Sequence, residues 1–491
     1  MEVSNKFVPR LNRMADLPYH FGLKMRCYPS YHQQAIIKLN GNNDRFLYNR
    51  LVAINRYTRL YRQFQIRNLW KEMNLPFSCK YRRAYWDVIN VMELRFHLIN
   101  WQLFQATLKD KQIKEIHPWF KDPLTDSLVP KTVRIKFRKA LHMMKVVNHH
   151  WPSFHKKSYQ LSYQTSCSYM GGRPTDLVSG SVYFIDHHHI RVPKIGRIRV
   201  AGSQQRIFDL AKKQLIRIGT VTIRKNSDDT YEISLALASN QPFVNVAKQM
   251  KHRIEEWKIL GIDLNLKNFL TASDGTTVDN PRFFAKAHRV LKRRQHALSR
   301  KQRRAKKEGR ALRNSKNYQQ NRIAVAKLQR HVKNQRNYFL NILSYHIIKN
   351  HDLVVTENLR SKNLLKNHAL ANRISDVGWR TFIQDLNYKA EFYNKLSVQV
   401  APNYTTQVCS NCSFRMGTHG SHKLTLDQRE WTCPSCGAHH LRDYNASLNI
   451  LAKGINQILV ESNCSKKIQR AKKTYLGNRD GLAKRFLKLQ W

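Results

Sequence analysis

The stretch that decides the fold reads CSNC at 409–412 and CPSC at 433–436, followed by RDYNASLNI at 442–450. Twenty residues separate the two C-x-x-C pairs, and this spacing is typical of a zinc ribbon. Each pair can hold one ion through the two thiolates of a tight turn, and two facing pairs complete a closed tetrahedral site. Two disulfides are the alternative, but they require an oxidising compartment, and we see no signal-peptide pattern after Met1. The sequence therefore predicts a Zn²⁺ site formed by Cys409, Cys412, Cys433 and Cys436.

The charge of the chain indicates a polyanionic partner. The 491 residues include 87 Lys and Arg against 32 Asp and Glu, a formal net charge of +55. Such a field attracts nucleic acid at long range, and no apolar run reaches the roughly 18 residues of a membrane span. Hydrophobic residues make up 42% of the chain, which excludes a disordered basic tail as the whole protein. We expect a nucleic-acid partner, no membrane association, and a cytoplasmic, nucleoid-associated location in a prokaryote.

Changes of periodicity predict a multidomain α+β protein. From Tyr31 to about Trp151, apolar residues recur at three- and four-residue spacing, which predicts a helical bundle. From about Ser158 the period is two, which predicts a β-barrel module whose first strand, at 20–29, lies before the helical block. From Trp257 the pattern becomes α/β, with strands expected at 258–264, 270–273 and 353–357 and a helix at 379–396.

Three carboxylates stand where core packing does not explain them. Asp263 interrupts an apolar strand, Glu357 ends another, and Asp443 opens an apolar helix. Singly, each has an ordinary explanation: a sheet-edge charge, a strand end or a helix N-cap. Together, at neighbouring strand ends and a helix start, they can hold two Mg²⁺ ions about 4 Å apart, the arrangement of phosphodiester hydrolysis. Three clustered negative charges repel one another unless cations neutralise them, so the pattern predicts Mg²⁺ (or Mn²⁺) on Asp263, Glu357 and Asp443.

Residues 281–340 contain 20 Lys and Arg and one acid, Glu308. Their helical spacing, with a break at 308–310, predicts two long helices folded back as a hairpin. A solvated face is the usual explanation of a charge run, but this excess is larger than solubility requires and favours a groove along a phosphate backbone. The nucleic-acid-binding residues that we expect are Arg293, Arg294, Arg300, Arg303, Arg304, Lys306 and Lys307.

The motifs GIDLN at 261–265, VVTENL at 354–359 and RDYNA at 442–446, in this order around the cysteine pairs, resemble the split RuvC nuclease of the TnpB proteins. These transposon-encoded proteins are relatives of the type V CRISPR effectors. Further stretches, RCYP at 26–29 and WRTF at 379–382, extend the resemblance over nearly the whole chain.

The resemblance implies a helical recognition bundle, a β-barrel wedge domain and an RNase H-like (RuvC) α/β nuclease domain with an inserted zinc ribbon. The implied boundaries are 1–30 for an N-terminal arm and first wedge strand, 31–155 for the recognition domain, 156–250 for the wedge, 251–408 for RuvC motifs I and II with the basic hairpin, 409–440 for the target-binding zinc ribbon, 441–460 for RuvC motif III, and 461–491 for a basic tail.

The implied activity is RNA-guided cleavage of DNA. A structured guide RNA would pair with double-stranded target DNA, protein contacts would read a short flanking motif, and one RuvC site with Asp263, Glu357 and Asp443 as catalytic residues would cut both strands. Two alternatives keep the fold: a compact type V CRISPR effector that uses a crRNA, and a non-cleaving RNA-guided repressor. Two others abandon it: a strand-transfer transposase with a protein-only reader, and a structural RNA-binding protein. The sequence leaves a monomer and a homodimer equally open.

Three positions depart from the pattern of the family. Asn265 stands where Gly is usual, and because Asn tolerates left-handed backbone better than most residues, we expect the turn to be kept. Ser413 replaces the Gly that is common after the first cysteine pair, whereas Gly437 keeps it after the second. Leu441 stands where an additional Asp is frequent, which removes one charge near the site but none of the three metal carboxylates.

Overall fold

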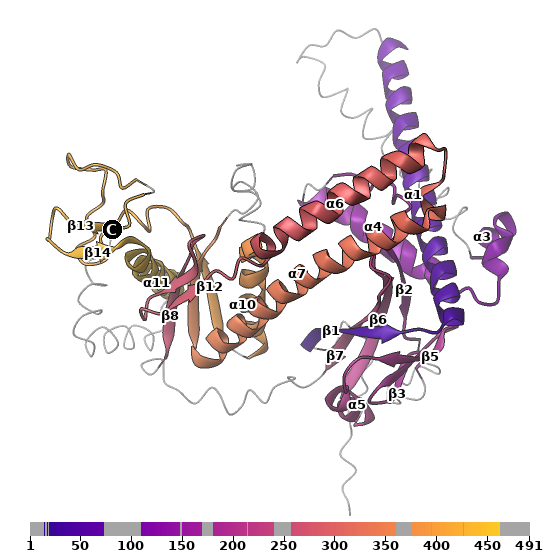
Figure 1. Cartoon of the computed structure of the whole chain (residues 1–491), viewed down its shortest axis with the longest axis horizontal. Helices are drawn as coiled ribbons and strands as arrows, with labels where there is room; N and C mark the ends of the chain where they lie inside the picture. The colour runs from indigo at the N-terminus through magenta and orange to yellow at the C-terminus, as the bar shows by residue number, and fades with distance from the viewer. Residues whose placement is uncertain are drawn as a thin grey trace, which may run out of the picture. The chain divides into compact units, whose positions relative to one another are not determined.

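The computed structural model describes residues 14, 17, 19–72, 110–147, 150–168, 180–213, 215–239, 257–359, 376–393, 395–425 and 427–461. They belong to two compact units, Met1–Gln241 and Pro242–Trp491, which are described separately (Figure 1). Part of the predicted helical bundle, at 73–109, and nearly all of the predicted basic tail lie outside the described residues. Among the helices that are described, none is long and apolar enough to cross a membrane.

The first unit is built on a seven-stranded sheet of order β2-β6-β7-β1-β5-β4-β3. Its strands are β1 (Tyr19–Tyr28), β2 (Leu161–Ser166), β3 (Tyr183–Asp186), β4 (His189–Val192), β5 (Gly196–Val200), β6 (Ile216–Lys225) and β7 (Tyr231–Ser239). Strand β1 pairs antiparallel with β7 from Tyr19↔Ser239 to Cys27↔Tyr231. The prediction that a strand before the helical block joins the later sheet is therefore confirmed.

The sheet is not the closed barrel that the sequence predicted. Strands β2 and β3 lie at opposite ends of the strand order, and in the described part of the chain no ladder joins them. Just beyond these strands the backbone N–H of Ser181 donates to the carbonyl of Ser168 (2.8 Å). Closure depends on strand number, tilt and stagger, and a period of two encodes none of these.

Helices pack on the β2 side of this sheet. They are α1 (Tyr31–Glu72) and α4 (Val129–Val147), which contact each other and β2. The shorter elements of the unit are α3 (Asp110–Ile116), the 3-10 helix η3 (Pro118–Lys121) and α5 (Gln205–Lys212). Apolar residues at helical spacing, among them Leu47, Leu51 and Phe137, are fully buried, as expected for helices that cover an apolar face.

The second unit contains a five-stranded sheet of order β10-β9-β8-β11-β12. Its strands are β8 (Ile259–Leu264), β9 (Asn268–Ala272), β10 (Thr277–Asp279), β11 (Leu353–Glu357) and β12 (Leu396–Val400). The first three strands along the chain pair antiparallel, whereas β8, β11 and β12 run parallel. The strands that the sequence predicted around Asp263 and before Glu357 are confirmed.

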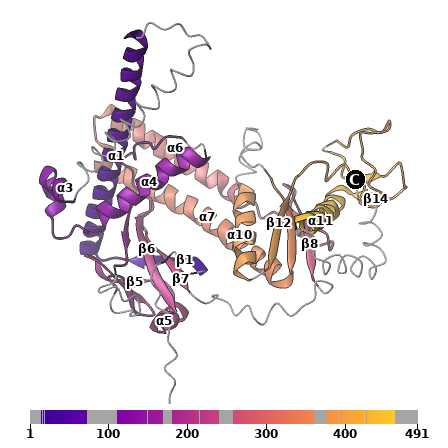
Figure 2. The ribbon, with the colours of Figure 1, turned by 180° about the vertical axis from the view of Figure 1, so that it is seen from behind.

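Two helices form a hairpin between β10 and β11. They are α6 (Phe283–Lys307) and α7 (Lys316–Asn350), which lie side by side in both views and are joined through the short 3-10 helix η7 (Leu312–Asn314) (Figures 1 and 2). Gly309 has a φ of 63° at the turn, a backbone conformation that Gly adopts without the steric cost of a Cβ. The predicted hairpin and its break are confirmed.

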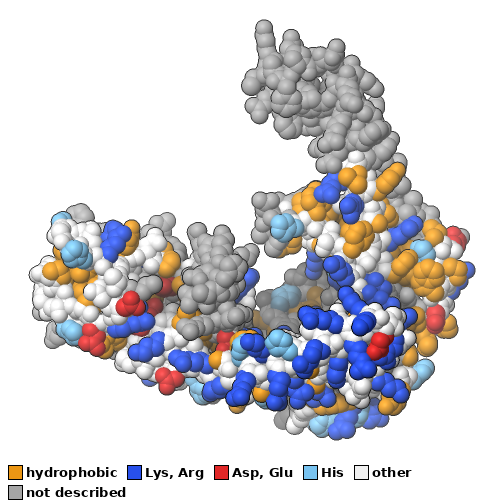
Figure 3. All heavy atoms as spheres, turned by 45° about the horizontal axis from the view of Figure 1, so that its top comes forward, with side chains coloured by type: hydrophobic (Ala, Val, Ile, Leu, Met, Phe, Trp, Pro, Cys, Tyr) orange, Lys and Arg blue, Asp and Glu red, His pale blue; other side chains and the backbone are white. Residues whose placement is uncertain are grey.

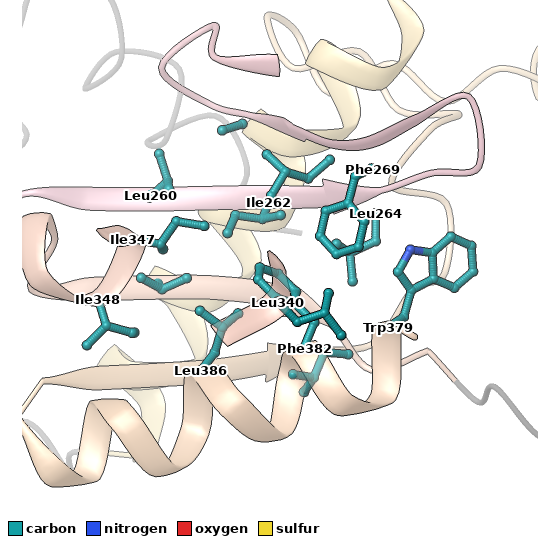
Figure 4. Close-up of a cluster of buried hydrophobic side chains, with 14 of the residues drawn as sticks. Leu260, Ile262, Leu264, Phe269, Leu340, Ile347, Ile348, Trp379, Phe382 and Leu386 are labelled. Carbon is teal, nitrogen blue, oxygen red and sulfur yellow. The ribbon is translucent and has the colours of Figure 1, made fainter. Parts of the chain in front are cut away.

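The two faces of the sheet in the second unit pack against different helices. On one face Leu260, Ile262 and Leu264 meet α7 and α10 (Trp379–Phe392) in the cluster of Figure 4. On the other face Leu353 and Val355 pack against α11 (Arg442–Glu461). Because side chains alternate along a strand, Asp263 and Glu357 belong to the face that α11 covers.

Helix α11 approaches the sheet very closely. A Cβ atom on Gly261 would stand 2.3 Å from the carbonyl oxygen of Ser447, and one on Gly454 would stand 2.4 Å from the side chain of Val355. Only glycine leaves room for this approach. The contact brings the first turn of α11 to the ends of β8 and β11.

Candidate functional site

Asp263 and Glu357 lie beside each other on neighbouring strands. β8 and β11 are parallel with Thr356 paired to Ile262, so Glu357 and Asp263 follow as the next residues in register. Both carboxylates are buried, with 6% and 7% of their surface exposed. Isolated buried carboxylates are costly, and this placement is therefore not that of a packing residue.

Asp443 reaches the same place from the first turn of α11. Burial, followed by the charges of Glu357 and Asp443, raises the pKa of Asp263 to about 8. A hydrogen bond from the Asn265 side chain and the charge of Arg442 oppose that shift. The three carboxylates named from the sequence thus share one electrostatic environment.

Basic and hydroxyl side chains surround the carboxylates. Burial raises the pKa of Glu357, and a hydrogen bond from Thr405 and the charge of Lys453 oppose the rise. Asp443 is paired with Arg429 at 3.5 Å and with Arg442 at 3.4 Å. Sequence reasoning assigned no role to these four partners. The only signal for them was proximity in the chain, Arg442 beside Asp443 and Thr405 just before the first cysteine pair.

The donor set of the three carboxylates suits hard cations such as Mg²⁺ or Mn²⁺, which prefer oxygen ligands. Burial first, and then the neighbouring charges of Glu357 and Asp443, disfavour the ionised form of Asp263, and a bound cation would offset both effects. Among the described residues, the four cysteines form the group whose ligand atoms lie close enough together to hold a single ion. The three carboxylates do not form such a group. The fit of the three carboxylates to divalent cations therefore rests on the chemistry of their oxygen donors and on their shared electrostatic environment.

The four cysteines converge between β13 (Glu430–Thr432), β14 (His439–Leu441) and the loop that begins at Cys409. The Sγ atoms of Cys409 and Cys436 are 3.7 Å apart, and those of Cys412 and Cys433 are 3.6 Å apart. A tetrahedral zinc with Zn–S bonds of about 2.3 Å separates its sulfurs by about 3.8 Å. A disulfide needs about 2.05 Å, so the cysteines are free thiols and their arrangement fits zinc.

Of the three unusual positions in the sequence, the backbone explains one, Ser413, and a side-chain role accounts for another, Asn265. Ser413 and Gly437, the residues after each cysteine pair, both have left-handed backbone, with φ of 65° and 70°. Asn265 does not have the left-handed backbone for which we expected its tolerance to matter. Its side chain is used instead, because Oδ1 accepts the N–H of Asn268 (2.9 Å) and Nδ2 donates to Thr271 (3.3 Å).

The seven basic residues predicted to bind nucleic acid all lie on α6 and are exposed. Arg304 forms an ion pair with Glu308 at 2.8 Å. Figure 3 shows Lys and Arg side chains gathered over the lower part of the view, where acidic side chains are few. The hairpin therefore presents a dense positive charge to solvent.

The fold and the site together define a class of protein: a sheet and a closely packed helix hold three carboxylates in one electrostatic environment, and a cluster of four free cysteines adjoins that helix. Residues 243–368, which contain Asp263, Glu357 and the hairpin, match the family OrfB_IS605, described as a probable transposase. Residues 379–450, which contain Asp443 and the cysteines, match the Cas12f1-like TNB domain. The second unit is thus similar to probable transposases of the OrfB_IS605 family and to the Cas12f1-like TNB domain.

Individual relatives carry the name "Putative RNA-guided DNA endonuclease". A protein of Streptomyces pristinaespiralis is 34% identical over 197 residues, which is 40% of this chain and 45% of the relative. A protein of Mycobacterium tuberculosis is 26% identical over 278 residues, 54% of this chain and 55% of the relative. InsQ of Escherichia coli is 28% identical over 211 residues, 40% of this chain and 49% of the relative. The chain spans about half the length of the curated relatives it matches.

Among solved structures, a Cas12f1-sgRNA-target DNA complex contains a chain that aligns with 88% of this protein and 98% of its own length. The identity is 14% and the TM-score is 0.46. At that level of similarity the match adds nothing to the argument from the site.

Proposed function

We propose that this protein is an RNA-guided DNA endonuclease and that its second unit hydrolyses the phosphodiester bonds of DNA. The observation that carries the proposal is that Asp263, Glu357 and Asp443, from two parallel strands and a helix, lie near enough for their charges to act on one another. The strand order, three antiparallel strands followed by parallel ones, supports an RNase H-like (RuvC) fold. The names of the relatives support guidance by RNA.

Asp263, Glu357 and Asp443 would hold Mg²⁺ or Mn²⁺. Bound there, the ions would supply Lewis-acid stabilisation of phosphate oxygens and lower the pKa of a bound water. The protein's own groups would orient these ligands: Thr405 would orient Glu357, and Arg429 and Arg442 would orient Asp443. Asp263 is buried, which would keep bulk water from its carboxylate. Cys409, Cys412, Cys433 and Cys436 would hold a structural Zn²⁺, which stabilises the ribbon at 409–440.

The exposed Arg and Lys residues of α6 would follow a phosphate backbone, because their charge is dense and only Arg304 among the seven has an ion pair within the described residues. We assign the guide RNA and the target duplex with its short flanking motif to the segments named from the sequence: recognition at 31–155, wedge at 156–250, nuclease at 251–408 and 441–460, and ribbon at 409–440.

A non-cleaving RNA-guided repressor is the second candidate. Loss of a carboxylate would favour it, but all three are present and meet at one site, which favours cleavage. A compact type V CRISPR effector differs only in the origin of its guide, a property of the gene's neighbourhood rather than of the site.

The test is to express the protein with its native flanking locus, sequence the RNA that co-purifies, and supply Mg²⁺ with DNA matched to the variable end beside randomised bases. We expect one discrete structured RNA and cleavage at targets that share a short flanking motif. Asp263→Ala should keep the RNA and lose cleavage, whereas Asp279→Ala, an exposed carboxylate of β10, should keep both. A heterogeneous mixture of cellular RNA, or cutting by Asp263→Ala, would contradict the proposal.

A further inference from the structure

Thr405 occupies a buried position between the sheet and the first cysteine pair. Its side chain is 3% exposed, and its hydroxyl lies 2.5 Å from Oε1 of Glu357. An ionised carboxylate only accepts hydrogen bonds, so the hydroxyl donates. The carbonyl of Pro402 lies farther from the same hydroxyl, at 3.4 Å. Glu357 is therefore the preferred acceptor, and the bond fixes the direction in which this carboxylate points.

The position of Thr405 is itself set by α11. We call residues 401–410, which lead from the end of β12 to the first cysteine pair, the ribbon root. Asn449 donates from Nδ2 to the carbonyls of Thr405 (2.8 Å) and Val408 (2.7 Å). Asn445 donates to the carbonyl of Val408 (2.7 Å) and accepts the N–H of Ser410 (2.9 Å).

A third side chain of α11 holds the start of the ribbon root. Lys453 donates from Nζ to the carbonyls of Ala401 and Asn403. Asn445, Asn449 and Lys453 follow one another at four-residue intervals, so they lie on one face of the helix. Both asparagines are buried, where a lost hydrogen-bond partner is costly. Three side chains on this face of α11 therefore hold the ribbon root in place through hydrogen bonds.

We propose that Thr405 is the positioning residue for Glu357, and that α11 sets its place through Asn445, Asn449 and Lys453. The inference rests on the proposed function, because Glu357 is taken as a metal-binding carboxylate. As a consequence, α11, which carries Asp443, also fixes the orientation of Glu357 through the ribbon root. Two of the three carboxylates are then oriented by one helix.

Thr405→Val tests the proposal because it removes the hydroxyl and keeps the shape. Thr405→Ser restores a donor. Thr356→Val is the matched control, since Thr356 directly precedes Glu357 but belongs to the opposite face, and its buried hydroxyl has no hydrogen-bond partner among the described residues. Each purified protein is assayed for zinc content, retained RNA, the Mg²⁺ dependence of single-turnover cleavage, and Mn²⁺ binding, with Asp263→Ala as the variant that we expect to lose Mn²⁺.

We expect Thr405→Val to lose about 10- to 100-fold in Mn²⁺ affinity or in cleavage at limiting Mg²⁺, the usual effect of removing a hydrogen bond to a metal ligand. Zinc content and retained RNA should stay unchanged. Thr405→Ser should recover most of this loss, because it restores the hydroxyl donor. Thr356→Val should match the wild type. A Thr405→Val protein with wild-type Mn²⁺ affinity and Mg²⁺ dependence would overturn the proposal.

The two proposals fail differently. If the wild type retains no discrete RNA and does not cut, the proposed function fails, while the comparison of Mn²⁺ affinities still decides the role of Thr405. If Thr405→Val loses zinc or melts early, Thr405→Ala replaces it, since that variant removes the same hydroxyl without a branched side chain. Equal Mn²⁺ affinity of Thr405→Ala and Thr405→Ser would then overturn the proposal.

Discussion

Gly261 of β8 lies directly beneath Ser447 of α11, so close that a Cβ at residue 261 would stand 2.3 Å from the Ser447 carbonyl oxygen. This contact determines how near α11, and with it Asp443, comes to Asp263. A methyl group at this position must push against backbone rather than against a flexible side chain. The geometry of the acidic site therefore depends on the absence of a side chain at Gly261.

Gly261→Ala should destabilise the second unit by about 1–3 kcal/mol, the usual cost of overpacking, and should strongly reduce cleavage because α11 is displaced. Chemical denaturation and single-turnover cleavage measure the two effects. Gly22→Ala is the control, since a Cβ on that strand glycine meets nothing within 4 Å. Equal stability and cleavage for the two variants would show that α11 is not held at this contact.

The pKa of Asp263, raised from 3.8 to about 8, predicts the pH dependence of stability without Mg²⁺. Below about pH 4 the carboxyl group is protonated in both the folded and the unfolded chain. Between about pH 4 and 8 the unfolded chain loses the proton while the folded chain keeps it, so the free energy of unfolding falls as pH rises. Above about pH 8 this loss is complete.

Asp263→Asn should therefore stabilise the Mg²⁺-free protein at pH 8, by an amount on the order of a few kcal/mol, and should have little effect at pH 4. Melting curves across this pH range, in buffer free of Mg²⁺ but with zinc retained, measure the difference. Addition of Mg²⁺ at pH 8 should stabilise the wild type and not the variant. A difference between the two proteins that is the same at every pH would contradict the raised pKa.

Cys433→Ser should release zinc and lower the melting temperature of the second unit, because binding of a structural zinc contributes directly to folding. Cleavage should be lost with it, since the ribbon root adjoins Glu357. Zinc analysis and calorimetry provide the measurement. Cys167→Ser, which changes a free cysteine of the first unit, should alter neither zinc content nor cleavage; a wild-type zinc content in Cys433→Ser would rule out the four-cysteine site.

Ser413→Gly should stabilise the ribbon by about 0.5–1 kcal/mol, because the φ of 65° at this position suits glycine. Gly437→Ala should destabilise it by a similar amount, since a Cβ there meets nothing within 4 Å and backbone strain alone opposes it. Competition with a zinc chelator compares the three proteins. Shifts of the same sign in both variants would show that the backbone conformation is not the cause.

On the hairpin, Arg303→Gln should weaken binding of RNA or DNA and reduce the slope of log affinity against log salt by about one. Arg304→Gln should have a smaller effect, because Glu308 already pairs with Arg304 at 2.8 Å. Salt titrations of filter binding measure both slopes. Two unchanged slopes would mean that this part of α6 does not follow a phosphate backbone.

Local pattern predicted much of the second unit. The alternation around Asp263 predicts that its side chain lies on the face of the sheet opposite Ile262 and Leu264. The structure confirms that Ile262 and Leu264 pack in the core cluster on that opposite face. The meeting of Asp263 with Glu357, 94 residues away, could not come from periodicity. That prediction depended on the order of the three motifs along the chain. Periodicity does not show which distant strands pair or in which register, because pairing is a property of the folded sheet.

Other features had no local signal. The predicted barrel was wrong, since closure of a sheet depends on the geometry of all its strands together. Thr405 and Lys453 were not assigned as partners of Glu357, because a hydroxyl on an irregular loop and a lysine on a helix look like ordinary surface residues in a sequence. Only tertiary packing brings the Thr405 hydroxyl into hydrogen-bond contact with Glu357 and the charge of Lys453 near it.

Strand β14 ends at Leu441 and α11 begins at Arg442, so no linker separates the ribbon from the helix that carries Asp443. The ribbon consequently lacks a hinge of its own and is continuous with one wall of the acidic site. If the protein is the nuclease proposed above, a chain made under zinc starvation would lose the geometry of its acidic site together with its ribbon. Incomplete assembly would then leave it unable to cut DNA.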